Sequence, residues 1–193
     1  MTTSLENVSK YESLKPRINS IKEKIAPLTA SNVKTADELK TEYEKLVQEL
    51  VAATEEKNII DSKEKLTLKI EEAKSFSKEL DVNTDFSKEK QKLEAKITET
   101  SNLKDANDNT STKILELHKQ LDDAIKAVKD SKEEILKQHN VVKDNIQNEL
   151  VKVDELLKTL PTNSDYETIK STLTTLKEET IKNKNLQSKQ KKN

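Results

Sequence analysis

The sequence predicts an all-α protein, an elongated rod of tandem antiparallel three-helix coiled-coil segments that share long continuous helices. Three observations support this fold class. The chain of 193 residues contains no Gly and no Cys, so it lacks the residue that tight β-hairpin turns favour and can form no disulfide. Charged residues make up 37% and aromatic residues 3%, which is typical of long amphipathic helices. Apolar residues recur at alternating spacings of three and four, as along the seam between packed helices.

Five helices are expected, two of them about twice as long as the others. A capping box, formed by Thr35 and Glu38, marks the start of the first long helix. The polar stretch that begins at Pro27 should end the helix before it. Asp85 and Asp165 are the expected N-caps of the third and fifth helices. The expected ranges are about 4–26, 36–80, 86–106, 112–160 and 166–188.

Apolar stripes run along these helices and form the expected core. Each stripe follows the spacing of one buried helix face. The stripes are Leu14, Ile18, Ile21, Ile25 and Leu28; Leu39, Tyr43, Leu46, Leu50 and Ala53; Ile114, Leu117, Leu121, Ala124, Val128 and Ile135; and Val142, Ile146, Leu150, Val153, Leu157 and Leu160.

Two internal matches indicate that the helical elements repeat. The turn at 80–86 returns at 160–166, with Leu, Asn, a hydroxyl residue, Asp and an aromatic residue in the same places. The segment 38–56 matches 116–134 at an offset of 78. A fixed period of this size is typical of tandem repeats.

The repeat places the expected boundaries inside the long helices 36–80 and 112–160. A long helix can pair with one short helix along its first half and with the next along its second half, which resembles spectrin repeats in topology. We expect a two-helix half-unit at 1–56, a central three-helix bundle at 57–135 and a second two-helix half-unit at 136–193. Three stacked segments of about 22 residues would span roughly 100 Å.

Polar residues interrupt the stripes where one segment should meet the next. Lys57 and Glu64 occupy stripe positions in the first long helix, and Ser131, Gln138 and Asn145 do so in the second. Loose patterning would explain these residues. We favour an exchange of partner helices, which would make these stretches the most easily bent parts of the rod.

Composition argues against an enzyme or a nucleic-acid-binding protein. Without Gly the chain lacks phosphate-cradling loops and nucleophile elbows. Its net charge of −1 creates no overall field for nucleic acid or an anionic membrane, and Arg17 is its only Arg. His118 and His139 would lie roughly 32 Å apart on one straight helix and could not share a metal. We therefore predict no catalytic, cofactor-binding or metal-binding residues.

A polar turn between the third and fourth helices partly matches a calcium-binding loop. Oxygen-bearing side chains occupy five of its ligand positions. However, Thr110 stands where the sharp turn needs Gly, and Lys113 places a cation at another ligand position. Turns rich in Asn and Asp produce such matches by chance, and we favour that interpretation. The five candidate ligands are Asp105, Asn107, Asn109, Ser111 and Glu116.

Two surface features have both a functional and a simpler interpretation. The basic end of the chain could engage sulfated glycans or acidic lipids, although such a run is more often a solvated helix end. The sequons at 7–9 and 109–111 matter only in a eukaryotic secretory pathway. The basic residues are Lys182, Lys184, Lys189, Lys191 and Lys192.

No apolar run approaches the roughly 20 residues of a membrane span, and residues 1–5 do not resemble a signal peptide. The chain is therefore expected to be either cytoplasmic or an internal fragment with a start Met. The repeat favours the fragment.

The Gly-free and Cys-free repeat, rich in Lys, Asn and Thr, carries the segment 35–39 and the two matching turns at 80–86 and 160–166. In these features it resembles the variable adherence-associated antigen family of Mycoplasma hominis, surface lipoprotein adhesins built from repeated cassettes. The resemblance implies an extracellular location, a lipid anchor encoded upstream and attachment to a host cell-surface protein or glycan. It transfers no adhesive residue. The alternative is an intracellular scaffold whose helices pair with a partner or, end to end, with another copy.

Overall fold

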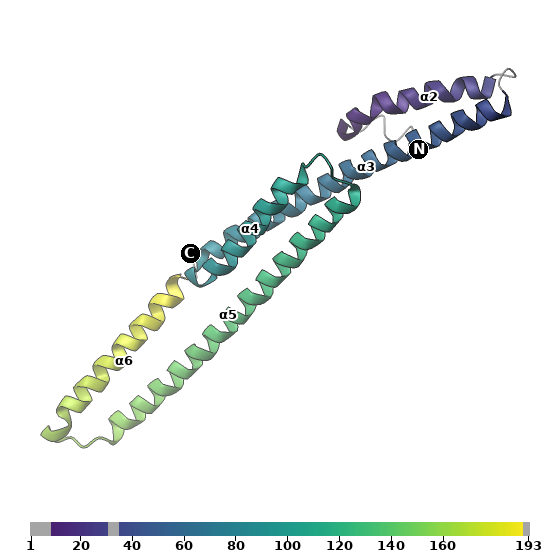
Figure 1. Cartoon of the computed structure of the whole chain (residues 1–193). Helices are drawn as coiled ribbons and strands as arrows, with labels where there is room; N and C mark the ends of the chain where they lie inside the picture. Colours follow the sequence, from purple (N-terminus) through teal and green to yellow (C-terminus); the bar gives the residue numbers. More distant parts are fainter. Residues whose placement is uncertain (1–8, 31–34, 191–193) are drawn as a thin grey trace. The chain divides into compact units, whose positions relative to one another are not determined.

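The computed structural model describes residues 9–30 and 35–190, and this part of the chain is all-α. It confirms the expected all-α class and the pattern of two long and three short helices (Figure 1). Short 3₁₀ segments η1 (Ser9–Leu14), η2 (Leu80–Val82) and η3 (Thr84–Phe86) adjoin the helices. None of the described helices is long and apolar enough to cross a membrane. The helices are α2 (Lys15–Ala30), α3 (Ala36–Glu79), α4 (Ser87–Lys104), α5 (Ser111–Thr159) and α6 (Ser164–Gln190).

The chain folds as two compact units. Unit 1 comprises Met1–Ala73 and Lys96–Asp123, and unit 2 comprises Lys74–Ala95 and Ala124–Asn193. Because the boundaries fall within α3, α4 and α5, each of these helices contributes one segment to each unit. The division at 56 and 135 that the repeat suggests stays a prediction.

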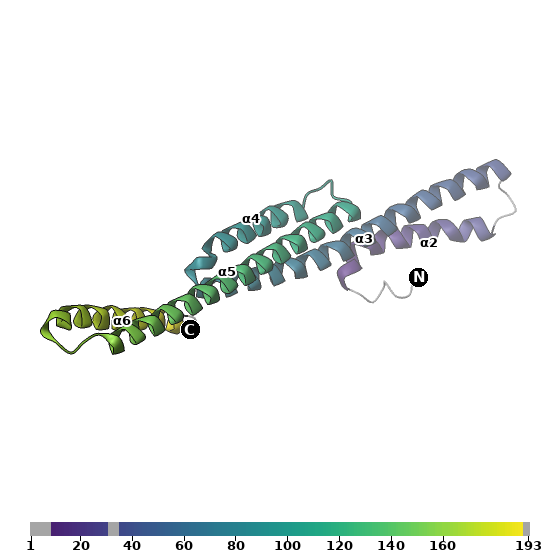
Figure 2. The ribbon, with the colours of Figure 1, turned by 90° about the horizontal axis from the view of Figure 1, so that it is seen from below.

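In unit 1, α2 lies antiparallel to the first half of α3 (Figures 1 and 2). Lys24 pairs with Glu49, and Arg17 Nε lies 3.4 Å from Glu56 Oε2. Further along α3, three helices meet and bury one another's apolar stripes. Their buried residues are Leu66, Ile70 and Ala73 on α3, Ile97 and Thr100 on α4, and Ile114, Leu117 and Leu121 on α5.

Helices α3 and α5 run in the same direction within unit 1. The backbone N–H of Ser111, at the start of α5, donates to Glu55 Oε1 over 2.7 Å, and the Ser111 hydroxyl bonds the same carboxylate at 3.0 Å. Further along both helices, Lys69 Nζ lies 2.7 Å from Asp122 Oδ1. A carboxylate at a helix N-terminus satisfies unpaired N–H groups and stabilises the helix dipole. Glu55 of α3 therefore stabilises the start of α5, where Thr110 Oγ1 also accepts the Lys113 N–H over 3.2 Å.

In unit 2, α6 folds back along the second half of α5 (Figures 1 and 2). Lys184 Nζ donates to Gln147 Oε1 over 2.6 Å, and Lys177 pairs with Asp154. The first part of α5 in this unit packs with the end of α3 and the start of α4. Residues buried there are Phe76, Leu80, Phe86, Leu93, Ile125 and Val128.

The local rules for helix ends succeed at α3. Thr35 N donates to Glu38 Oε2 over 2.8 Å, and Glu38 N donates to Thr35 Oγ1 over 3.4 Å. These reciprocal bonds confirm the capping box.

In contrast, the expectation that Pro27 ends the first helix is wrong. Helix α2 continues to Ala30 with Pro27 inside it. The helix lacks one backbone hydrogen bond there, because Pro has no N–H to donate.

The repeated turns use an Asn where the sequence suggested an Asp. Asn83 Oδ1 accepts the Asp85 N–H at 3.0 Å and caps η3, so Asp85 is not an N-cap. Asp165 is also not an N-cap, because α6 begins one residue earlier, at Ser164. Backbone bonds of 3.1 Å from Phe86 to Asn83 and 3.2 Å from Tyr166 to Asn163 show that both turns close in the same way.

Val128 tests whether the predicted stripe on α5 is the buried one. Its side chain is 5% exposed, whereas Lys126 is exposed. Val128→Asp would bury an unpaired charge and should lower the stability by about 3 kcal/mol or more, or the melting temperature by at least about 6 °C. Lys126→Ala should change it little. Equal melting temperatures by circular dichroism would contradict the assigned face.

Thr100 tests how much a buried hydroxyl without a hydrogen bond destabilises the core of unit 1. Its side chain is fully buried, and Thr100 Oγ1 makes no hydrogen bond within the part of the chain that the structure describes. Thr100→Val should stabilise the protein by about 1 kcal/mol. The matched control is Thr180→Val at the equivalent repeat position, because Thr180 is half-buried and its hydroxyl already donates to Leu176 O at 2.7 Å. A loss of stability for Thr100→Val in urea unfolding would refute this assignment.

Candidate functional site

One face of the first half of α3 is apolar and open to solvent. Leu39, Tyr43, Val47 and Leu50, called the α3 stripe below, recur at helical spacing and are 36–64% exposed. The expectation that Leu39, Tyr43 and Leu50 belong to the core is therefore wrong. Helix α2 pairs with a neighbouring face of α3, where Ala53 is buried. An exposed apolar row of this kind, rimmed by charged residues, is typical of an interaction surface.

The internal repeat contains a second copy of this stripe, and there it is covered. Leu117, Leu121, Ile125 and Val128 of α5 match the four members of the α3 stripe at an offset of 78 and are at most 9% exposed. Burying each such side chain contributes about 1.5–3 kcal/mol. The α3 stripe is therefore a helix seam that lacks its covering helix.

In unit 2, an apolar groove lies between α6 and the second half of α5. The groove is open, with a volume of about 360 Å³, and we call it the α5–α6 groove. Its surface is mainly apolar, and such a groove suits the apolar face of an amphipathic helix. The apolar residues that line it include Val142, Ile146, Leu150, Val153, Leu173 and Leu176.

The repeat shows what normally fills such a groove. Ile146, Leu150 and Val153 match Leu66, Ile70 and Ala73 of α3 at an offset of 80. In unit 1 those three side chains are at most 4% exposed, because α4 and the first part of α5 cover them. The α5–α6 groove is the corresponding surface without a third helix. Ile146 and Val153 are half-buried there, whereas Leu150 is already only 7% exposed.

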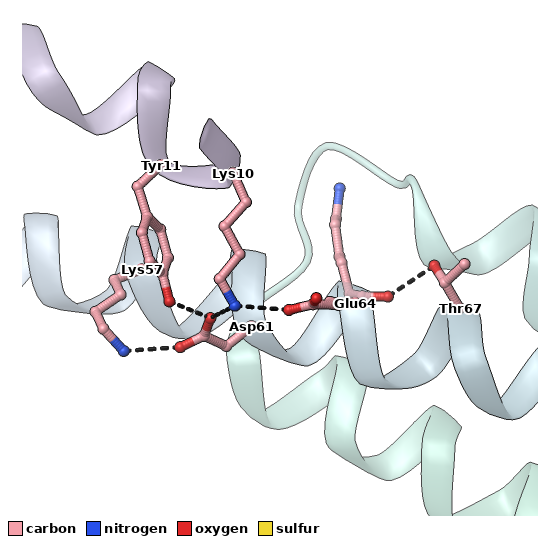
Figure 3. Close-up of polar contacts among 7 residues, drawn as sticks. Lys10, Tyr11, Lys57, Asp61, Glu64 and Thr67 are labelled. Atoms are coloured by element: carbon pink, nitrogen blue, oxygen red, sulfur yellow. Dashed lines mark hydrogen bonds and ion pairs between the residues drawn. The ribbon is translucent and has the colours of Figure 1, made fainter. Parts of the chain in front are cut away.

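A polar cluster on α3 holds the N-terminal 3₁₀ segment in place (Figure 3). The Tyr11 hydroxyl donates to Asp61 Oδ1 over 2.5 Å, and Lys10 Nζ lies 2.9 Å from the same oxygen. Lys57 Nζ donates to Asp61 Oδ2 over 2.7 Å, while Lys10 also reaches Glu64 at 2.6 Å. Both lysines lie over the ring of Tyr11, at 4.9 and 5.7 Å from its centroid.

The charges in this cluster stabilise one another. Burial opposes ionisation of Asp61, but hydrogen bonds from Lys57, Tyr11 and Lys10 outweigh it and hold the pKa of Asp61 well below its usual 3.8. A hydrogen bond to Glu64, followed by one to Asp61, raises the pKa of Lys10. The hydrogen bond to Asp61 raises the pKa of Lys57. All three groups are therefore charged at neutral pH.

Three of the five interrupted stripe positions contact another helix or 3₁₀ segment. The exchange of partner helices there stays a prediction. Lys57 and Glu64 belong to the polar cluster, and the neighbouring Glu55 binds the start of α5. In α5, Ser131 is half-buried and donates to the buried Glu89 of α4 over 3.3 Å. The other two predicted positions, Gln138 and Asn145, are exposed.

Two of the five candidate calcium ligands, Asn109 and Ser111, make contacts at helix ends. Asp105 Oδ1 lies 3.6 Å from Lys63 Nζ, and Glu116 accepts a hydrogen bond from Gln120. Asn109 Nδ2 donates to the carbonyls of Leu103 and Lys104 at the end of α4, over 2.7 and 2.9 Å. Ser111 binds Glu55 at the start of α5, and Lys113 Nζ lies 2.8 Å from Asp108. The turn is thus organised by capping and by a lysine, which a calcium loop would not need.

The two histidines lie on α5 in different units. His139 Nε2 is 3.1 Å from Asp85 Oδ2, and His118 is half-buried. Among the residues that the structure describes, no three His, Asp or Glu side chains are placed to hold a metal ion.

The basic end of the chain is only partly within the described residues. Lys182 is exposed on α6, and Lys184 binds Gln147. The side chains of Lys189, Lys191 and Lys192 lie outside the described residues, as do two residues of the sequon at 7–9. The sequon at 109–111 uses Asn109 to cap α4.

The polar cluster predicts a pH-dependent attachment of η1 to α3. Since the folded pKa of Asp61 is depressed, its contribution is complete above about pH 5 and is lost as the pH falls through 3.8 and below. Asp61→Asn should cost about 1–2 kcal/mol at pH 7 and progressively less toward about pH 2.

Hydrogen exchange of residues 9–21 and urea unfolding measure this effect at each pH. Asp130→Asn is the matched control, because Asp130 is exposed. A difference between Asp61→Asn and the wild type that stays constant from pH 7 to about pH 2 would contradict the role of this carboxylate.

Comparison with protein-family models, with curated proteins and with solved structures finds no match to this chain. The function must therefore be inferred from the helix faces themselves. Two of these faces, the α3 stripe and the α5–α6 groove, expose surfaces whose repeat counterparts are buried.

Proposed function

We propose that this chain is the helical region of a bacterial surface adhesin that attaches to host cells through exposed helix faces. The observation that carries this proposal is the α3 stripe, an apolar row left open while its repeat counterpart on α5 is buried. Large exposed apolar rows on soluble proteins mark sites of protein interaction. Its partner would be a host cell-surface protein, or a glycan bound by the basic end of the chain.

In this proposal the rest of the fold serves as a spacer. Tandem spectrin-like three-helix segments that share α3 and α5 would form an extended rod, with a lipid anchor encoded outside this chain. Helices α3 and α5 are 44 and 49 residues long, or roughly 66 and 74 Å at 1.5 Å per residue. Resemblance to the repeat-containing mycoplasma lipoprotein adhesins supports this setting, because repeat number would set the reach.

A second candidate is a scaffold protein that acts by helix–helix association inside the cell. The α5–α6 groove favours it, because a groove of this shape accepts an amphipathic helix. The two functions predict different partners. An adhesin binds the surface of intact host cells, whereas a scaffold binds a helical partner and leaves host cells unlabelled.

Cell binding tests the adhesin. The purified chain should bind host cells saturably and compete with the adherence of the parent organism. Leu50→Glu should weaken binding at least about tenfold, because it places a charge in the α3 stripe. Leu68→Glu is the control, since Leu68 is an exposed residue of α3 outside the stripe. Absence of saturable binding would refute the adhesive function.

Small-angle scattering of the same chain tests the spacer. A rod of tandem segments should give a maximum dimension of roughly 100 Å. A compact particle, with a radius of gyration near the ~16 Å expected for a globular chain of this length, would refute it.

A further inference from the structure

We propose that the chain assembles head to tail, with the α3 stripe of one copy seated in the α5–α6 groove of the next. This inference goes beyond attachment to a host. In an open chain of copies, only the terminal copy would keep its α3 stripe free for a host partner, and the same contact would serve a scaffold. The occupant of the groove is a second copy of this chain, and the contact joins the N-terminal hairpin α2–α3 to the C-terminal hairpin α5–α6.

The first argument is that the chain already contains an equivalent contact within one molecule. In unit 1, the surface formed by Leu66, Ile70 and Ala73 is covered by the segment of α5 that carries Leu117 and Leu121. The groove repeats that surface at an offset of 80, and the α3 stripe repeats that segment of α5 at an offset of 78. Groove and stripe are thus copies of two surfaces that pack together within one molecule.

The second argument is charge. Residues 36–56 of α3 include seven acidic side chains and two lysines, a net charge of −5, whereas residues 180–184, the last of α6 whose side chains the structure describes, include two lysines and no acidic residue. In unit 1, α3 and α5 run parallel, since Glu55 pairs with Ser111 and Lys69 with Asp122. In the same orientation, the acidic start of α3 would meet the basic end of α6.

Helix α2 determines how the junction is built. It stays paired with α3 through Lys24–Glu49 and Arg17–Glu56, so the junction holds four helices, two from each copy. Two antiparallel hairpins with open apolar faces form a four-helix bundle by facing each other. Since stripe and groove differ, the contact is heterologous and generates chains or rings of copies.

One pair in the proposed register is unfavourable, and it makes the register testable. The Lys69–Asp122 ion pair of unit 1 corresponds to Glu149 of one copy facing Glu44 of the next. Lys152 Nζ lies 2.7 Å from Glu149 Oε1 and reduces the repulsion. Natural association should therefore be weaker than the buried apolar surface alone would produce.

Sedimentation of the full chain from about 1 µM to about 1 mM tests the assembly. The average mass should rise with concentration beyond that of a dimer. Tyr43→Glu should stop this by disabling the stripe, and Leu176→Glu should stop it by disabling the groove. Both residues are more than half exposed in the monomer, so helix content and melting temperature should not change. Leu68→Glu, also exposed, should associate like the wild type.

Mixing the two disabled variants distinguishes stripe-to-groove association from other modes of self-association. Tyr43→Glu keeps an intact groove and Leu176→Glu keeps an intact stripe, so an equal mixture should form one-to-one dimers and nothing larger. A mixture that remains monomeric would overturn the proposal, as would association by either variant alone or a monomeric wild type at about 1 mM.

Glu44→Lys tests the register. It would restore an opposite-charge pair with Glu149 and should tighten association about threefold. Unchanged or weaker association would overturn the register. Neither measurement involves host cells, so failure of self-assembly and failure of adhesion are read separately.

Discussion

Every helix in this chain depends on the burial of an apolar stripe that no single neighbour can cover. Two helices in contact leave part of the stripe in water, and a third closes it. Where three helices meet, Leu66, Leu93 and Leu121 are fully buried. Where only two meet, as between α5 and α6, Leu176 remains more than half exposed. An uncovered stripe therefore has two consequences. The chain loses the roughly 1.5–3 kcal/mol of stability that burying each side chain would contribute, and it exposes a surface to which a partner can bind.

Buried or half-buried carboxylates determine which residues of neighbouring helices lie opposite each other. A stripe that repeats every three or four residues tolerates a shift of one heptad, whereas a specific polar contact does not. Asp61 receives hydrogen bonds from three side chains, Glu55 binds the start of α5, and Glu89 accepts one from Ser131. These contacts occur beside the interrupted stripe positions, so residues that weaken the seam also define its alignment.

Helix ends were predictable where they depend on neighbours in sequence. The capping box of Thr35 and Glu38 lies within a single helical turn and is confirmed. The Asp85 cap was wrong because η3 begins at Thr84 with Asn83 as its cap, so Asp85 already lies inside a helical turn. The end expected at Pro27 was wrong because α2 continues through it. The contact between Tyr11 and Asp61 joins residues 50 apart. Only the i,i+4 pair Lys57 and Asp61 was visible as a local pattern there.

The sequence by itself determined the helical class, the number and approximate ends of the helices, and the spacing of the apolar stripes, because spacing and capping are properties of a short stretch of chain. It could not show which stripes are covered. Leu50 and Val128 are equivalent in the repeat, yet one is 55% and the other 5% exposed. Only the tertiary structure decided this difference, because burial depends on how many other helices the chain brings to the same face.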